Sequence, residues 1–177
     1  MQKLTSLGYE IGNILKFVEF LAMTDIDEID RKILRILQTD GKIGTQELAE
    51  KIGMSTSPCW RRVRKLEENG IIDGYVALLD AKQLGLNARA YVHVSLVDHT
   101  EDSIQRFDSF VAREDQIVEC SSITGAEDYL LKVVAQDPEG LEQFIMRKIL
   151  ALGIVRNSTT HFVLRQKKYS TSLPLHS

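Results

Sequence analysis

The sequence predicts an α+β protein with two domains, and two changes of pattern along the chain support this fold class. Up to about residue 80, apolar residues recur at the three- and four-residue spacing of amphipathic helices. After residue 86, strand-like and helix-like stretches alternate. The length of 177 residues, with 44% hydrophobic and 27% charged residues, suits two small globular domains and argues against general disorder.

Three short helices are expected in the first domain, which we place at residues 25–80. They cover residues 27–39, 45–52 and 55–69, and a glycine follows each of them, Gly41, Gly53 and Gly70. Asp25 and Glu28 have the spacing of a capping box at the start of the first helix. Residues 71–80 are expected to form two short strands around the Asp73-Gly74 turn, a small wing. This order is the layout of a winged helix-turn-helix.

Positive charge is concentrated on the third of these helices. Residues 55–69 hold four positive and two negative side chains, whereas residues 25–72 as a whole hold nine of each sign. Arginine forms bidentate hydrogen bonds with guanine, and small hydroxyls at a helix start can approach phosphates closely. The expected DNA-binding residues are Ser55, Thr56, Ser57, Trp60, Arg61, Arg62, Arg64 and Lys65.

A basic helix face taken alone is as often simply solvated as functional, so this interpretation depends on the helix-turn-helix layout around it. With that layout, double-stranded DNA is the expected partner. For Trp60 the sequence supports a half-buried packing role as well as it supports a DNA contact. Cys59, Val63 and Leu66 form the stripe of the same helix that is expected to be buried.

The second domain, placed at residues 86–165, has the element order βαββαβ. Strands are expected at residues 88–97, 117–123, 129–135 and 155–164, and helices at residues 101–112 and 141–152. This is the order of a ferredoxin-like fold, in which two helices cover one face of an antiparallel sheet.

The third expected strand, YLLKVVA, is apolar on both faces apart from Lys132. A strand with one solvated face should instead alternate apolar and polar residues. We therefore expect a second copy of the same sheet to cover the open face. The resulting two-fold homodimer suits a protein that reads two DNA half-sites.

The turn before this strand carries groups that suit a zwitterion. Thr124 and Gly125 offer a hydroxyl and open backbone, and Glu127 and Asp128 place carboxylates beside them. Backbone amides can bind a carboxylate while acidic side chains bind an ammonium group. Spacing alone nevertheless favours a solvated acidic turn over a ligand site.

Residues 1–24 form an N-terminal extension with an apolar stretch that is too short to span a membrane and too charged for a signal peptide. Two interpretations are equally supported: the stretch packs on a partner surface as an amphipathic helix, or Met23 is the natural start and the residues before it are a translation-start artefact. Residues 166–177 form a C-terminal tail. Cys59 and Cys120 fit neither a zinc site nor a disulfide scaffold, so a cytoplasmic protein without a membrane partner is expected.

Several long stretches, in the same order, resemble the Lrp/AsnC (leucine-responsive, feast/famine) family of transcriptional regulators. The resemblance covers residues 25–164. The resemblance is seen in the stretches IDEIDRKILRILQTDGK, LAEKIGMSTSPCWRRVRKLEENGII, GYVALLD, GAEDYLLKV and LGIVRNSTTHFVL. The sequence departs from the family at Gly44, where a Ser or Asn cap is usual, at Trp60, which is bulkier than expected, and in the N-terminal extension.

This resemblance implies a sequence-specific DNA-binding regulator that responds to a small effector, an amino acid, and that forms dimers which assemble to octamers. It also implies that the effector binds near the glycine-acid turn. The residues are Thr124, Gly125, Glu127, Asp128, Tyr129, Leu150 and Leu152. The apolar residues near the turn favour leucine or methionine over a charged effector. No cofactor and no metal ion is expected.

Two other functions stay open at this point. One is an architectural DNA-binding protein whose C-terminal domain only assembles it, and the less favoured one is an enzyme on the ferredoxin-like domain. The sequence has no phosphate-binding loop, and its histidines lack metal-ligand spacing and a partner nucleophile. These histidines are His93, His99, His161 and His176. An enzyme is therefore not expected.

Overall fold

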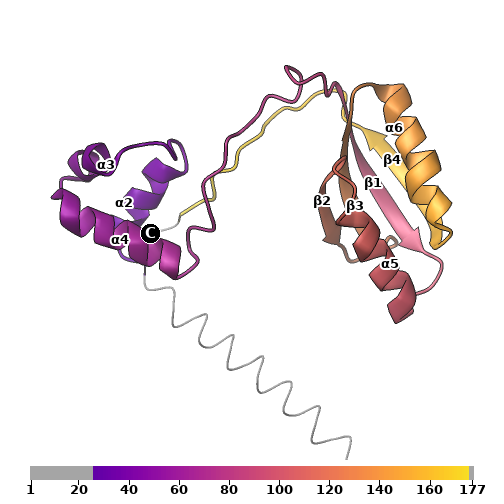
Figure 1. Ribbon diagram of the computed structural model, residues 1–177, viewed down its shortest axis with the longest axis horizontal. Helices are drawn as coiled ribbons and strands as arrows, with labels where there is room; N and C mark the ends of the chain where they lie inside the picture. Colours follow the sequence, from indigo (N-terminus) through magenta and orange to yellow (C-terminus); the bar gives the residue numbers. More distant parts are fainter. Residues whose placement is uncertain (1–25, 176–177) are drawn as a thin grey trace, which may run out of the picture. The chain divides into compact units, whose positions relative to one another are not determined.

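The computed structural model describes residues 26–175, which form two compact units (Figure 1). The first unit contains the described residues up to Ala77 together with those from Ser170 onward. The second runs from Leu78 to Tyr169. The N-terminal extension and Asp25 lie outside the described residues, so the interpretations of that segment stay predictions.

The first unit is built from three helices around one apolar core. They are α2 (Glu28–Leu37), α3 (Thr45–Ile52) and α4 (Thr56–Glu68). These bounds agree to within one or two residues with the helical periodicity. The core consists of Ile33, Leu34, Leu48, Ala49, Cys59 and Leu66. Each helix contributes one apolar stripe to this core, and packing of these stripes is the main source of helix stability in a unit this small.

The start of α2 differs from the expected capping box. Asp27 is the N-cap, its Oδ1 accepts a hydrogen bond from the amide of Asp30 at 2.8 Å, and the Asp30 carboxylate accepts one from the amide of Asp27. The prediction that used Asp25 and Glu28 is therefore wrong in register. Both pairs have the same spacing, and the true pair is the one whose second carboxylate also meets Arg62 on α4.

No strand forms between residues 71 and 87, so the expected two-stranded wing is absent from this part of the chain. Tyr75 returns towards the helices, whereas Val76, Leu78 and Leu79 are exposed. A hairpin this short has little stability without a packed face or a third strand, and neither is available here.

The second unit is a four-stranded antiparallel sheet with the order β2-β3-β1-β4. The strands are β1 (Ala88–Leu96), β2 (Ile117–Ser122), β3 (Tyr129–Ala135) and β4 (Val155–Phe162). The helices are α5 (Glu101–Val111) and α6 (Pro138–Phe144), and α6 continues into a π-turn (Ile145–Ile149) and a 3-10 turn (Leu150–Leu152). This is the expected ferredoxin-like fold.

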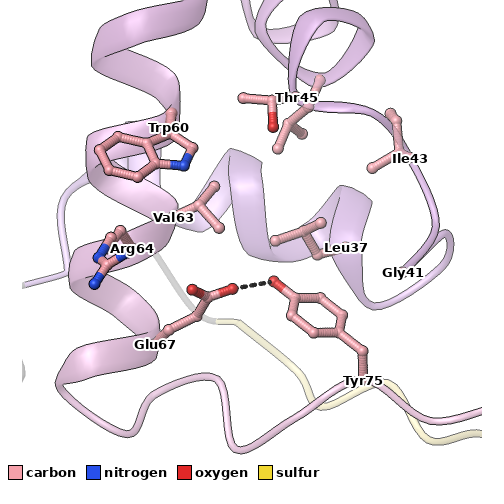
Figure 2. Close-up of a pocket in the computed structure, with 10 residues that line it drawn as sticks. Leu37, Gly41, Ile43, Thr45, Trp60, Val63, Arg64, Glu67 and Tyr75 are labelled. Atoms are coloured by element: carbon pink, nitrogen blue, oxygen red, sulfur yellow. Dashed lines mark hydrogen bonds between the residues drawn. The ribbon is translucent and has the colours of Figure 1, made fainter.

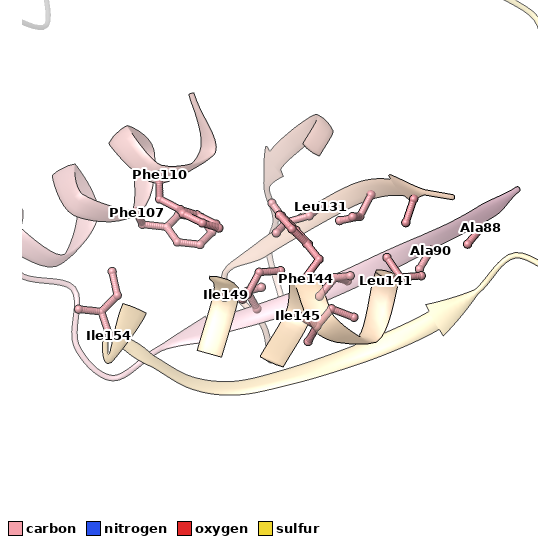
Figure 3. Close-up of a cluster of buried hydrophobic side chains, with 14 of the residues drawn as sticks. Ala88, Ala90, Phe107, Phe110, Leu131, Leu141, Phe144, Ile145, Ile149 and Ile154 are labelled. Atoms are coloured by element: carbon pink, nitrogen blue, oxygen red, sulfur yellow. The ribbon is translucent and has the colours of Figure 1, made fainter. Parts of the chain in front are cut away.

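Both helices pack on the same face of the sheet. Phe107 and Phe110 of α5 share one buried cluster with Leu141 and Phe144 of α6, and the rings of Phe110 and Phe144 stack with centroids 6.4 Å apart (Figure 3). The strands contribute the side chains that alternate inward, such as Leu131 on β3. The other face of the sheet carries no helix of this unit.

Candidate nucleic-acid interface and ligand turn

Helix α4 presents most of the predicted DNA-binding residues on one exposed side. Ser55 is its N-cap and its first turn carries no acidic residue, so the positive end of the helix dipole is not neutralised there. The buried side consists of Cys59, Leu66 and the half-buried Val63. The exposed residues are Ser55, Thr56, Ser57, Trp60, Arg61, Arg64 and Lys65.

The structure does not group Arg62 with these exposed residues. Its Nη1 lies 2.7 Å from Asp27 Oδ2 and 2.8 Å from Asp30 Oδ1. The hydrogen bonds that Arg62 donates to Asp30 and Asp27 raise the pKa of Arg62, and the hydrogen bond from the Asp30 amide is the main cause that lowers the pKa of Asp27. Arg62 therefore ties α4 to the start of α2.

Trp60 and Arg64 form a pair on the exposed side of α4. The guanidinium carbon of Arg64 lies 5.5 Å from the centre of the Trp60 ring, and its Nε donates to Glu68 at 2.9 Å. The indole is half exposed. These two contacts hold the guanidinium of Arg64 in one place, so less side-chain freedom is lost when it binds a partner.

A pocket of about 210 Å³ lies between the three helices and Tyr75 (Figure 2). The Tyr75 hydroxyl donates to Glu67 Oε1 at 3.0 Å, and burial together with this contact raises the pKa of Tyr75 to about 12. Trp60 lines the same pocket, which agrees with a partial packing role for its ring. The hydrogen bond between Tyr75 and Glu67 holds the first residues after α4 against the helices, where the sequence predicted wing strands.

The acidic turn between β2 and β3 is held by Asp128. Its Oδ2 accepts a hydrogen bond from the amide of Leu96 at 2.8 Å, and His99 Nε2 lies 2.9 Å from its Oδ1. Burial by itself would raise the pKa of Asp128, but the Leu96 and His99 contacts outweigh it, and the pKa is lowered. The Asp128 carboxylate is thus occupied within the chain.

The other residues of the predicted effector site have different environments. Thr124 and Gly125 are exposed, Glu127 is half-buried, and Gly125 has a φ of 131°, a backbone conformation that favours glycine. The ring of Tyr129 packs against Phe107 at 4.5 Å between centroids. Leu152 packs against the core and Leu150 is 37% exposed.

Sequence spacing could not have found His99 as a partner of Asp128. The two residues meet because β1 pairs antiparallel with β3, with Val94 opposite Tyr129. The amide of Asp128 also donates to the carbonyl of Val94 at 3.0 Å. His99 and Asp128 come together only because of the register between β1 and β3, which a single sequence does not reveal.

The uncovered face of the sheet is mixed in character. The rings of His93 and His161 meet edge to face at 5.3 Å, and Tyr91 beside them is 38% exposed. The Nδ1 atom of His93 is buried and has no hydrogen-bond partner among the described residues. Within residues 26–175 we find no cluster of His, Cys, Asp or Glu suited to a metal ion, and no helix long and apolar enough to cross a membrane.

The sequence matches two protein-family models. Residues 26–73 match a winged helix-turn-helix DNA-binding model, and residues 89–173 match the Lrp/AsnC ligand-binding domain. The chain is 35% identical to the DNA-binding transcriptional activator DecR of Escherichia coli K12, over 85% of this chain and 99% of DecR. It is 37% identical to the leucine-responsive regulatory protein of Klebsiella pneumoniae, over 84% of this chain and 91% of that protein.

A solved relative has the same fold. It is a transcriptional regulator of Neisseria meningitidis in complex with L-methionine, with a TM-score of 0.81 and 34% identity over 84% of this chain and 96% of that one. By their names, DecR is a transcriptional activator and the protein of Neisseria meningitidis a transcriptional regulator. With a helix-turn-helix that binds DNA and a C-terminal domain that binds a small ligand, the chain belongs to the Lrp/AsnC family of transcriptional regulators.

Proposed function

We propose that this regulator reads its operator through the exposed side of α4 and responds to an amino acid bound at the turn between β2 and β3. The observation that carries the first half is the set of exposed basic residues Arg61, Arg64 and Lys65 on a helix that Arg62 fixes to α2. The role of the chain is regulatory and not catalytic, as in the relatives above. Its free cysteines agree with a site of action in the cytoplasm.

In this proposal the residues of α4 have three roles. The hydroxyls of Ser55, Thr56 and Ser57 approach the phosphates or base edges at the start of the helix. Arg61 and Arg64 enter the major groove of double-stranded DNA, and Arg64, held between Trp60 and Glu68, is the better candidate for a bidentate contact with guanine. Arg62 contributes orientation.

The effector we propose is an aliphatic amino acid such as methionine or leucine. The relative from Neisseria meningitidis was solved with L-methionine, and another relative is named for leucine. The open backbone at Thr124 and Gly125 suits a carboxylate, and Glu127 suits the ammonium group. Asp128 and Tyr129 shape the turn, and the half-exposed Leu150 together with Leu152 supplies an apolar wall.

We further propose a homodimer through the uncovered sheet face, with octamers formed from these dimers. The half-buried His93, the exposed Tyr91 and the apolar Leu130 lie on that face. Exposed apolar residues in the segment after Tyr75, namely Val76, Leu78 and Leu79, offer a further surface for a second copy.

Operator binding tests the assignment of α4. A duplex is first selected from a random library with the full-length protein, and its affinity is then measured by fluorescence anisotropy at several salt concentrations. We expect Arg64→Ala to weaken the binding free energy by about 1–3 kcal/mol and to relax specificity at one base pair of the operator. If Arg61 contacts a phosphate, Arg61→Ala should reduce the slope of log affinity against log salt concentration by about one. Arg113→Ala, an exposed arginine of the sheet unit, is the matched control. Unchanged affinity in both α4 variants would contradict the proposal.

A thermal-shift screen with each standard amino acid, followed by calorimetry, tests the effector. A ligand at a hundredfold excess over its Kd adds about 2.7 kcal/mol to the free energy of unfolding. We expect methionine or leucine to raise the midpoint and Glu127→Gln to abolish the shift, while Glu142→Gln on α6 leaves it unchanged. A flat screen with intact operator binding would favour the architectural alternative, in which the second unit only assembles the protein.

A further inference from the structure

The C-terminal segment of the chain returns to the helical unit after the sheet is complete. Strand β4 ends at Phe162, and the residues up to Tyr169 belong to the sheet unit. From Ser170 onward the described residues belong with the helices α2 to α4. No sequence pattern indicated this return, because the segment has neither helical nor strand periodicity.

Three hydrogen bonds and one apolar contact hold this segment on one flank of α2. The side-chain amide of Gln38 pairs with both backbone groups of Leu173: its Nε2 donates to the carbonyl at 3.3 Å, and its Oε1 accepts from the amide. Arg35 Nη2 donates to the carbonyl of Leu175 at 3.4 Å. The side chain of Leu175 is partly buried against the helical core.

The chemistry of this contact is that of peptide recognition. The amide group of a glutamine side chain can pair with both the N–H and the C=O of one residue, in the same way as the backbone of a neighbouring β-strand does. Pro174 favours an extended conformation of Leu173 and removes one amide that would otherwise need a partner, so the segment loses less conformational entropy on docking. The flank is defined by Arg35 and Gln38, one helical turn apart at the end of α2.

We infer that this flank of α2 is a docking surface for residues 170–175 of the same chain, and that the docked segment completes the DNA-binding unit. Leu175 adds apolar burial to a three-helix core that is small on its own. The chain also leaves the helical unit at Ala77 and comes back to it at Ser170, so docking attaches this unit to the sheet unit at two points of the chain instead of one. The inference does not depend on the proposed operator or effector.

The position of the single tryptophan makes this inference testable. Trp60 lies in the helical unit, so its fluorescence reports the unfolding of that unit inside the full-length protein. We expect a chain that ends at Tyr169 to lose about 4–8 °C in the Trp60 midpoint. Gln38→Ala should reproduce part of this loss in the full chain and have no further effect in the shortened one.

Gln46→Ala is the matched control, because Gln46 is an exposed glutamine of the same unit whose side chain donates a hydrogen bond to Glu50 on its own helix. Its effect should be the same in both chain lengths. An unchanged midpoint in the shortened chain, or an equal effect of Gln38→Ala in both lengths, would overturn the inference. A midpoint difference that grows with protein concentration would assign the docked segment to a second copy and overturn the intrachain contact.

Discussion

At the scale of single residues, Asp128 makes the structure of the turn sensitive to acid. Its pKa is lowered in the folded protein from about 3.8, so the carboxylate favours the folded state at every pH above that value. This contribution is lost as the pH falls from the ordinary pKa through the lowered one, because over that range the unfolded chain binds a proton that the folded carboxylate does not. We expect Asp128→Asn to lower the free energy of unfolding by about 1 kcal/mol at pH 7.

The measurement is urea unfolding of both proteins between pH 7 and pH 2.5. The difference between them should shrink below about pH 3.8 and vanish at the acid end of the series. Asp102→Asn on the exposed start of α5 is a control whose effect should stay small throughout. A difference that stays constant across the whole pH range would contradict the role given to the Asp128 carboxylate.

The two cysteines are expected to react with a thiol reagent at very different rates. Cys59 is fully buried in the helical core, and burial raises its pKa. Cys120 is exposed on β2, although partial burial and the nearby Asp108 raise its pKa as well. Since the thiolate is the reactive form, Cys120 should react first and Cys59 only when the helical unit opens.

Reaction with a chromogenic disulfide under native conditions measures both rates. Cys120→Ser should leave one slow phase, and low concentrations of urea should accelerate this phase. If both thiols react in a single fast phase in the native protein, Cys59 is not buried in the helical core.

At the scale of elements, α3 begins without a side-chain cap. Gly44 occupies the N-cap with a φ of −70° and a ψ of 148°, and an added Cβ would meet no atom within 4 Å. Serine at this position can accept a hydrogen bond from an amide of the first turn, and it also reduces the freedom of the unfolded chain. We expect Gly44→Ser to raise the free energy of unfolding by about 0.5 kcal/mol.

Chemical unfolding, with Trp60 fluorescence as the signal, measures this change in the free energy of unfolding. Gly44→Ala reduces the freedom of the unfolded chain in the same way but lacks the hydroxyl, so the serine variant should be more stable than the alanine variant. Equal stability of the two variants would show that the hydroxyl makes no cap.

Elements with a strong periodic pattern were predictable from the sequence, and β3 was placed at residues 129–135 without error. The wing was predicted wrongly, because a short hairpin needs another element to pack against, and the sequence of residues 71–80 does not show whether one is available. The π-turn at Ile145–Ile149 was also missed, since its apolar residues fit an α-helix equally well. Among the site residues, the exposed side of α4 followed from periodicity, whereas the occupied state of Arg62 and Asp128 depends on tertiary contacts.

At the scale of the whole molecule, the proposed dimer through the uncovered sheet face would bring two α4 helices to one operator. Tyr91 lies opposite Lys132 on β3 and His161 on β4, in the middle of that face. A glutamate there stays solvated in a monomer, with Lys132 beside it, but would be buried in the proposed dimer at a cost of several kcal/mol. We therefore expect Tyr91→Glu to convert the dimer to a folded monomer in sedimentation velocity at micromolar concentration.

Ser109→Glu adds the same charge on the exposed side of α5 and should remain dimeric. The loss of the dimer has a consequence for DNA, because a two-fold dimer places two α4 helices in successive major-groove segments, whereas a monomer binds a single half-site. Tyr91→Glu should therefore bind a two-half-site operator much more weakly than Ser109→Glu does, while the two variants bind an isolated half-site equally. A wild-type protein that sediments as a monomer, or a dimeric Tyr91→Glu variant, would show that assembly does not use this face.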